Sequence, residues 1–167
     1  MRIGLLLPAL LIVIVLDGCG DSPTSPGARA DTSWLLAEMP AAAVPVAEAK
    51  RTAREGDEVV VRGRIGGRRD PMTAGSAVFV MMDPAIPHCE IGKCKAPWDY
   101  CCETPESITD NSATVKLVGA GGKLMSVDLA DHAIKPLDEV VVVGTVGPRP
   151  NEDVFVIHAT KLHRVSG

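Results

Sequence analysis

Aromatic side chains and the common catalytic motifs are what this sequence lacks. Phe, Trp and Tyr make up 3% of the 167 residues, which leaves few rings on which nucleic-acid bases could stack. The formal net charge is −4, so the protein also lacks the positive field that attracts nucleic acids. No HExxH, Walker or GxGxxG motif is present. We therefore expect no enzyme activity, and nucleic acid is a poor candidate partner.

The first 18 residues have the features of a signal peptide. Met1-Arg2 is followed by an apolar run over residues 3–16, shorter than the about 20 residues of a membrane span. The run ends in Leu16-Asp17-Gly18-Cys19, which resembles the bacterial lipobox. The resemblance implies that the Cys19 thiol is acylated and becomes the mature N-terminus. We predict a signal peptide over 1–18 and a lipidated Cys19 with a flexible tether over 19–43.

Two other interpretations of the N-terminus remain open. Ala28-Arg29-Ala30 could be a cleavage site that yields a soluble secreted protein, and the apolar run could stay uncleaved as an anchor. All three place the domain outside the cytosol. We expect a lipoprotein of the bacterial cell envelope, facing the periplasm or the outer surface. Its partners would be the membrane, through the lipid, and an unknown envelope ligand or protein.

Residues 44–167 are predicted to form one mainly β domain, because valine dominates its apolar positions. A short helix is expected over 45–55, since Pro45 suits a helix start and Gly56 a stop. On one strand, Val61 and Ile65 share a face with Gly63, and Arg62 lies on the other face. Gly119 to Gly122 indicate a hairpin turn. The expected strands cover 59–65, 77–82, 113–118, 123–129, 139–146 and 154–165.

Two of these strands repeat each other. Residues 57–66 and 138–147 are identical at seven of ten positions, which indicates two strands with the same geometric role in a closed sheet. Gly63 and Gly144 hold equivalent positions, where a glycine permits a strand to bend.

A Val-rich strand ends in Gly-x-Ile, a second strand ends in Asp83, and a later strand repeats the first. The order of the strands resembles the OB-fold. The similarity is to small exported bacterial OB domains and to nucleic-acid-binding OB domains. It implies a five-stranded Greek-key barrel that binds ligands across strands two and three. We predict a small five- to six-stranded OB-like barrel with a short N-terminal helix and a long cysteine-rich insertion over 84–111. Single-stranded nucleic-acid binding is an alternative function that follows from the resemblance alone.

The 28-residue insertion holds four of the five cysteines. Loops of this length are usually functional or cross-linked. An even number of cysteines in an exported protein predicts two disulfides. A Cys101–Cys102 bond would close a strained ring, so Cys89 and Cys94 would each join one member of the adjacent pair. Trp98 and Tyr100 would then be exposed at the loop tip as candidate ligand contacts.

A metal site is the alternative for the same loop. The four thiolates together with His88 offer soft ligands to zinc or copper, although the C-x4-C-x6-C-C spacing differs from the C-x2-C pairs of common zinc modules. No C-x-x-C pair is present to indicate a redox dithiol. We therefore expect a binding or interaction module without a cofactor, with envelope metal binding or thiol redox chemistry by the cysteine loop as the alternative.

Overall fold

The computed structural model describes residues 32–165. The predicted signal peptide, Cys19 and the tether as far as residue 31 lie outside the described residues. Among residues 32–165, no helix is long and apolar enough to cross a membrane.

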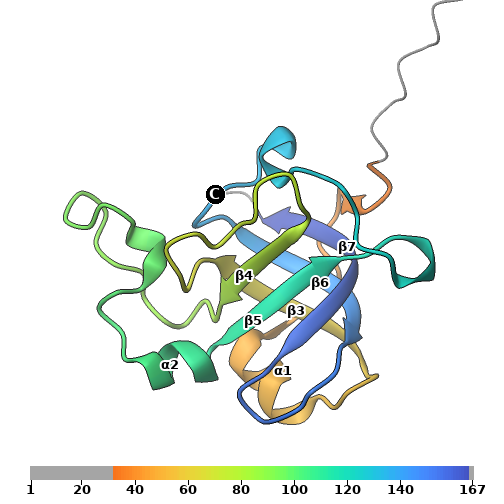
Figure 1. Cartoon of the computed structure of the whole chain (residues 1–167), viewed down its shortest axis with the longest axis horizontal. Helices are drawn as coiled ribbons and strands as arrows, with labels where there is room; N and C mark the ends of the chain where they lie inside the picture. Colours follow the sequence, from red (N-terminus) through yellow and green to blue (C-terminus); the bar gives the residue numbers. More distant parts are fainter. Residues whose placement is uncertain (1–31, 166–167) are drawn as a thin grey trace, which may run out of the picture. The chain divides into compact units, whose positions relative to one another are not determined.

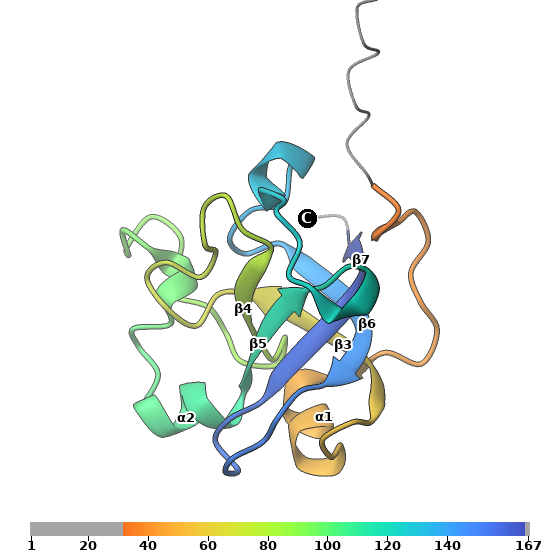
Figure 2. The same ribbon diagram turned by 45° about the vertical axis from the view of Figure 1, so that its right-hand side comes forward.

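Five strands form a closed barrel (Figures 1 and 2). β3 pairs with β4, β4 with β5, β5 with β7, β7 with β6, and β6 again with β3. The β5–β7 pair is parallel and the other four are antiparallel. This connectivity is that of an OB-like barrel, and it confirms the predicted fold class. The strands are β3 (Glu58–Ile65), β4 (Val78–Met82), β5 (Ser112–Leu117), β6 (Glu139–Val146) and β7 (Val156–Val165).

Two short strands extend the sheet beyond the barrel. β1 (Leu35–Leu36) runs parallel to β7, and β2 (Val44–Pro45) runs parallel to β3. Trp34, next to β1, is 1% exposed and belongs to the barrel core. The folded domain therefore includes residues that the sequence assigned to the tether.

The two similar strands β3 and β6 lie beside each other in the barrel. They form an antiparallel pair in which Gly63 is opposite Val140 and Gly144 is opposite Val59. The alternation predicted for β3 is confirmed, because Val61, Gly63 and Ile65 are buried and the residues between them are partly exposed. The sequence repeat thus reflects two strands that contribute equivalent faces to one core.

Helix α1 (Val46–Thr52) packs against the barrel with Val46 and Ala49 in the core (Figure 1). It is shorter than predicted, and Pro45 occupies the N-cap position, where it offers no side-chain acceptor. The carboxylate of Asp83, at the end of β4, accepts the backbone N–H of Ala47 at 2.8 Å instead. The aspartate that ends the second barrel strand therefore caps the helix from another element.

The strand expected over 123–129 is not formed, and this prediction is corrected. The predicted hairpin turn is present, because the N–H of Gly119 donates to the carbonyl of Lys123 and the N–H of Met125 to that of Leu117. Beyond the isolated bridge between Val118 and Leu124, the chain continues without a strand to the short helical turn η3 (Leu129–His132). β5 already pairs with β4 on one edge and β7 on the other, so no free edge is left for a hairpin partner. The glycines of 119–122 form the single turn η2 (Ala120–Gly122).

The cysteine-rich insertion connects β4 to β5 and contains regular structure that was not predicted from the sequence. It includes the single turn η1 (Pro97–Asp99) and helix α2 (Pro105–Asp110). Thr104 caps α2, and its hydroxyl accepts the N–H of Ser107 at 3.1 Å. A threonine followed by proline is a common helix start, so this signal was present in the sequence.

Candidate metal centre

The insertion is fastened to the loop between β3 and β4. The backbone N–H of Gly67 donates to the carbonyl of Trp98 at 2.8 Å. The indole Nε1–H of Trp98 donates back to the carbonyl of Arg69 at 2.9 Å. Trp98 is partly buried. These two bonds make Trp98 an anchor that holds the insertion to the barrel, in addition to any ligand contact it makes.

Tyr100 is fully buried, which corrects the prediction that it is exposed at the loop tip. Its ring lies against Gly66, where a Cβ atom would be 2.7 Å from Cε2 of the ring. The glycine leaves the space that the ring fills. Burial raises the pKa of the Tyr100 hydroxyl. Tyr100 is thus the apolar contact that seats the insertion, and it is not available to a partner.

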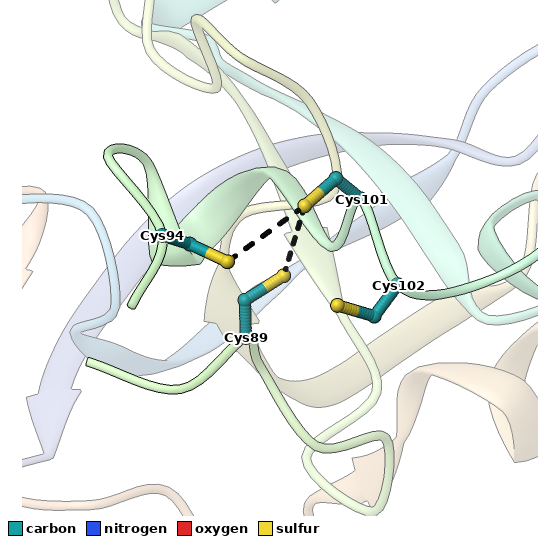
Figure 3. A group of neighbouring side chains, drawn as sticks. All are labelled: Cys89, Cys94, Cys101 and Cys102. Carbon is teal, nitrogen blue, oxygen red and sulfur yellow. Dashed lines mark hydrogen bonds between the residues drawn. The ribbon is translucent and has the colours of Figure 1, made fainter. Parts of the chain in front are cut away.

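Four cysteine side chains of the insertion converge on one another (Figure 3). Their Sγ atoms all lie within 4.8 Å of one another. Cys101 is the central member, with its Sγ 3.4 Å from that of Cys89 and 4.0 Å from that of Cys94. All four are free thiols, so the two predicted disulfides are not formed in this structure.

Two tight turns bring the sulfur atoms together. Gly92, at φ +91°, reverses the chain, and the N–H of Cys94 donates to the carbonyl of Glu90 at 3.3 Å. Tyr100 adopts a left-handed conformation at φ +57° after η1. The Asp99 carboxylate then accepts the N–H of Cys101 at 3.0 Å. Both turns lie within the insertion and set the backbone directions from which the thiols converge.

The four thiols differ in exposure, and three of them have shifted pKa values. Cys89 is 4% exposed, whereas Cys101 and Cys102 are exposed. Burial opposes ionisation of Cys89, but the Cys102 backbone N–H and the neighbouring thiols together lower the pKa of Cys89. Hydrogen bonding to Cys89 and then to Asp99 raises the pKa of Cys101, and bonding to Cys89 raises the pKa of Cys102. The pKa is therefore lowered at the buried Cys89 and raised at the two exposed thiols beside it.

His88 does not belong to the cluster, although the metal alternative included it. Its Nδ1–H donates to the carbonyl of Cys89 at 2.8 Å. The group of potential metal ligands consists of the four cysteines alone. Within residues 32–165, no other His, Cys, Asp or Glu group of three or more has this geometry.

Two of the sulfur–sulfur distances are close to those of a tetrahedral metal site. Zinc binds thiolate sulfur at about 2.3 Å, which places the sulfurs of a regular tetrahedron about 3.8 Å apart. The two short distances in the cluster, 3.4 and 4.0 Å, lie on either side of that value. Four sulfur ligands in a tetrahedron are typical of zinc or iron.

A hollow of about 1090 Å³ lies between α1 and the β6–β7 connection. The Lys50 Nζ donates to the carbonyls of Thr109 and Asp153 at 2.5 and 2.7 Å. The Arg149 guanidinium donates to two carbonyls of α1 and its C-cap. Burial lowers the pKa of Lys50. Both cations therefore hold the end of α1 in place.

No family model and no curated protein matches this chain. Among solved structures, the chain is similar to the hypothetical protein ygiW from E. coli. The two are 16% identical with a TM-score of 0.38, and the match covers 75% of this chain and 94% of that one.

Proposed function

We propose that this protein is a zinc-binding module in which one Zn²⁺ is held by Cys89, Cys94, Cys101 and Cys102. The observation that carries the proposal is the convergence of four free thiols within 4.8 Å. Thiolates are soft donors that select zinc or iron in a tetrahedral S4 site. In this proposal zinc cross-links the insertion in place of the two disulfides that the sequence predicted.

The energetics of the insertion support a bound metal. Ordering a residue costs about 1–2 kcal/mol of backbone entropy, and few residues of 84–111 are buried to offset that cost. The buried ones are Cys89, Pro97 and Tyr100. A structural zinc supplies its binding free energy to folding, so it would stabilise a segment that has almost no core of its own.

The zinc would be structural. A site with four protein ligands leaves no open position for water or substrate, unlike the three-ligand sites of zinc enzymes. The hydrogen bonds of Trp98 hold the ordered insertion beside the β3–β4 loop. OB-folds bind their ligands with such loops and the adjoining strands. The proposed function is therefore a non-catalytic binding module whose ligand surface is shaped by the metal.

Native mass spectrometry of the full-length protein, purified with its thiols reduced, tests this proposal. We expect one zinc per chain, and we expect Cys101→Ser/Cys102→Ser to lose it. His88→Ala is the matched control, because His88 is adjacent to a ligand but points its Nδ1–H at a carbonyl; it should retain the zinc. A wild-type chain that stays metal-free with equimolar zinc present, or one that holds iron instead, would overturn the proposal.

A further inference from the structure

We infer that peroxide opens the proposed zinc centre and converts its ligands into two disulfides, Cys89–Cys101 and Cys94–Cys102. This inference rests on the proposed function, and it adds a redox response and a defined pairing to it. The cluster then has two closed states, one with metal and one with sulfur–sulfur bonds.

Exposure determines where oxidation begins. Cys101 and Cys102 are exposed to solvent, and Cys94 is partly exposed. Cys89 is 4% exposed, less than any of the other three. A small oxidant therefore reaches the adjacent pair first, and the buried Cys89 is placed to react with whichever sulfur has been oxidised. Redox-sensitive cysteines are commonly accessible thiols beside a second, resolving thiol.

Distance determines the pairing. The Cys89 and Cys101 sulfurs are 3.4 Å apart, closer than the 4.0 Å between Cys94 and Cys101. A bond between Cys101 and Cys102 would require a strained ring of adjacent residues. Once Cys89 joins Cys101, the remaining sulfurs of Cys94 and Cys102 lie within 4.8 Å of each other. Short side-chain movements complete both bonds without moving the barrel.

The chemistry balances with hydrogen peroxide as the oxidant. The Cys101 thiolate attacks one peroxide oxygen and breaks the O–O bond, giving a sulfenic acid and hydroxide. The Cys89 thiolate then attacks the Cys101 sulfur and expels a second hydroxide as the disulfide forms. The same two steps join Cys94 and Cys102. In total, four thiolates lose four electrons to two peroxide molecules. The zinc-bound thiolates, two peroxides and four protons give two disulfides, four waters and free Zn²⁺.

The oxidised loop remains cross-linked. Two disulfides would restrict the unfolded chain, so they replace the metal as the constraint on the insertion. The two interpretations of the cysteines from the sequence, disulfides and a metal site, then describe two redox states of one cluster.

Zinc release during a peroxide titration tests this inference. The zinc-loaded full-length chain would carry Cys19→Ser, which leaves the four cluster cysteines of the five in the sequence. A chromogenic chelator should report one zinc per chain after two equivalents of hydrogen peroxide, and reduction should allow zinc to rebind. Zinc and thiols that survive excess peroxide would overturn the inference and leave the proposed function intact, whereas a chain that never loads zinc would overturn the proposed function.

Peptide mapping without reductant tests the pairing. Trypsin cuts after Lys93 and Lys95, which places Cys89, Cys94 and the Cys101–Cys102 pair on separate peptides. We expect all three peptides to be linked, with fragmentation assigning Cys89 to Cys101. A Cys89–Cys94 link, or a Cys89–Cys102 link, would overturn the assignment.

Two matched double variants examine the pairing without metal. Cys94→Ser/Cys102→Ser leaves Cys89 and Cys101, whereas Cys89→Ser/Cys102→Ser leaves Cys94 and Cys101. We expect the first variant to form its disulfide at least several-fold faster under the same peroxide concentration. Equal rates, or a faster second variant, would contradict the role of the 3.4 Å contact.

Discussion

Gly144 lies where β6 passes so close to β7 that a Cβ atom would press on backbone. It would contact the carbonyl oxygen of His158 and would be 2.6 Å from the Cα of Ala159. A strand irregularity falls at the same point, between Val143 and Gly144. The equivalent Gly63 is opposed by side chains instead, and a Cβ atom there would be 2.8 Å from Sδ of Met81. The two glycines thus occupy equivalent positions in the sequence repeat, but Gly144 faces backbone and Gly63 faces side chains.

We expect alanine to be much more costly at Gly144 than at Gly63. The flexible Met81 side chain can move aside, so Gly63→Ala should lower the free energy of unfolding by about 1 kcal/mol. The backbone of β7 cannot move aside in the same way, so Gly144→Ala should lower it by about 3 kcal/mol. Urea denaturation of both variants and the wild type measures the difference. Equal midpoints for the two variants would contradict the close crossing of β6 and β7.

At the residue scale, the sequence predicted local roles better than long-range contacts. The special positions of Gly63 and Gly144 followed from the strand repeat. The burial of Tyr100 could not be predicted, because the space for its ring is provided by Gly66 from another loop. The four cysteines were identified as one group, but their convergence within 4.8 Å could not be predicted from the spacing, because it depends on the turns at Gly92 and Tyr100.

At the scale of elements, the barrel and the insertion are stabilised in different ways. The barrel strands bury alternating apolar side chains, and no cluster cysteine lies in a strand. The insertion depends on a few anchors, among them Trp98, Tyr100 and the thiol cluster. The strands were predictable because valine-rich runs have a clear period. The false strand over 123–129 arose because a sequence pattern does not show that both edges of β5 are occupied.

Removal of zinc should therefore loosen the insertion and leave the barrel folded. With a chelator and reductant, we expect trypsin to cut first after the exposed Lys93 and Lys95, at least tenfold faster than in the zinc-bound protein. Far-ultraviolet circular dichroism should show the β signal retained. Cleavage at an unchanged rate would show that the metal does not act on this loop, and global unfolding on zinc removal would show that its effect is not confined to the loop.

At the scale of the whole molecule, the barrel domain is preceded by a segment with a proposed separate role. Cys19 is the one cysteine outside the cluster, and its sequence context predicted lipidation. A lipid at that position would hold the barrel and its metal-shaped surface at a membrane. The partner would then be met at the membrane surface.

We expect Cys19→Ser to release the protein from the membrane fraction or to block its processing. The reason is that serine offers no thiol for acylation. Cell fractionation followed by mass measurement of the mature chain reports both effects. Cys102→Ser is the control and should fractionate like the wild type; a Cys19→Ser protein that stays with the membrane would mean that the anchor lies elsewhere.

The proposed function depends on Cys89, Cys94, Cys101 and Cys102 binding one zinc ion together. X-ray absorption at the zinc edge of the purified, reduced protein tests this most directly, since it reports the atoms bound to the metal. We predict four sulfur neighbours at about 2.3 Å. Nitrogen or oxygen neighbours at about 2.0–2.1 Å in place of any of the sulfurs would contradict the four-cysteine centre.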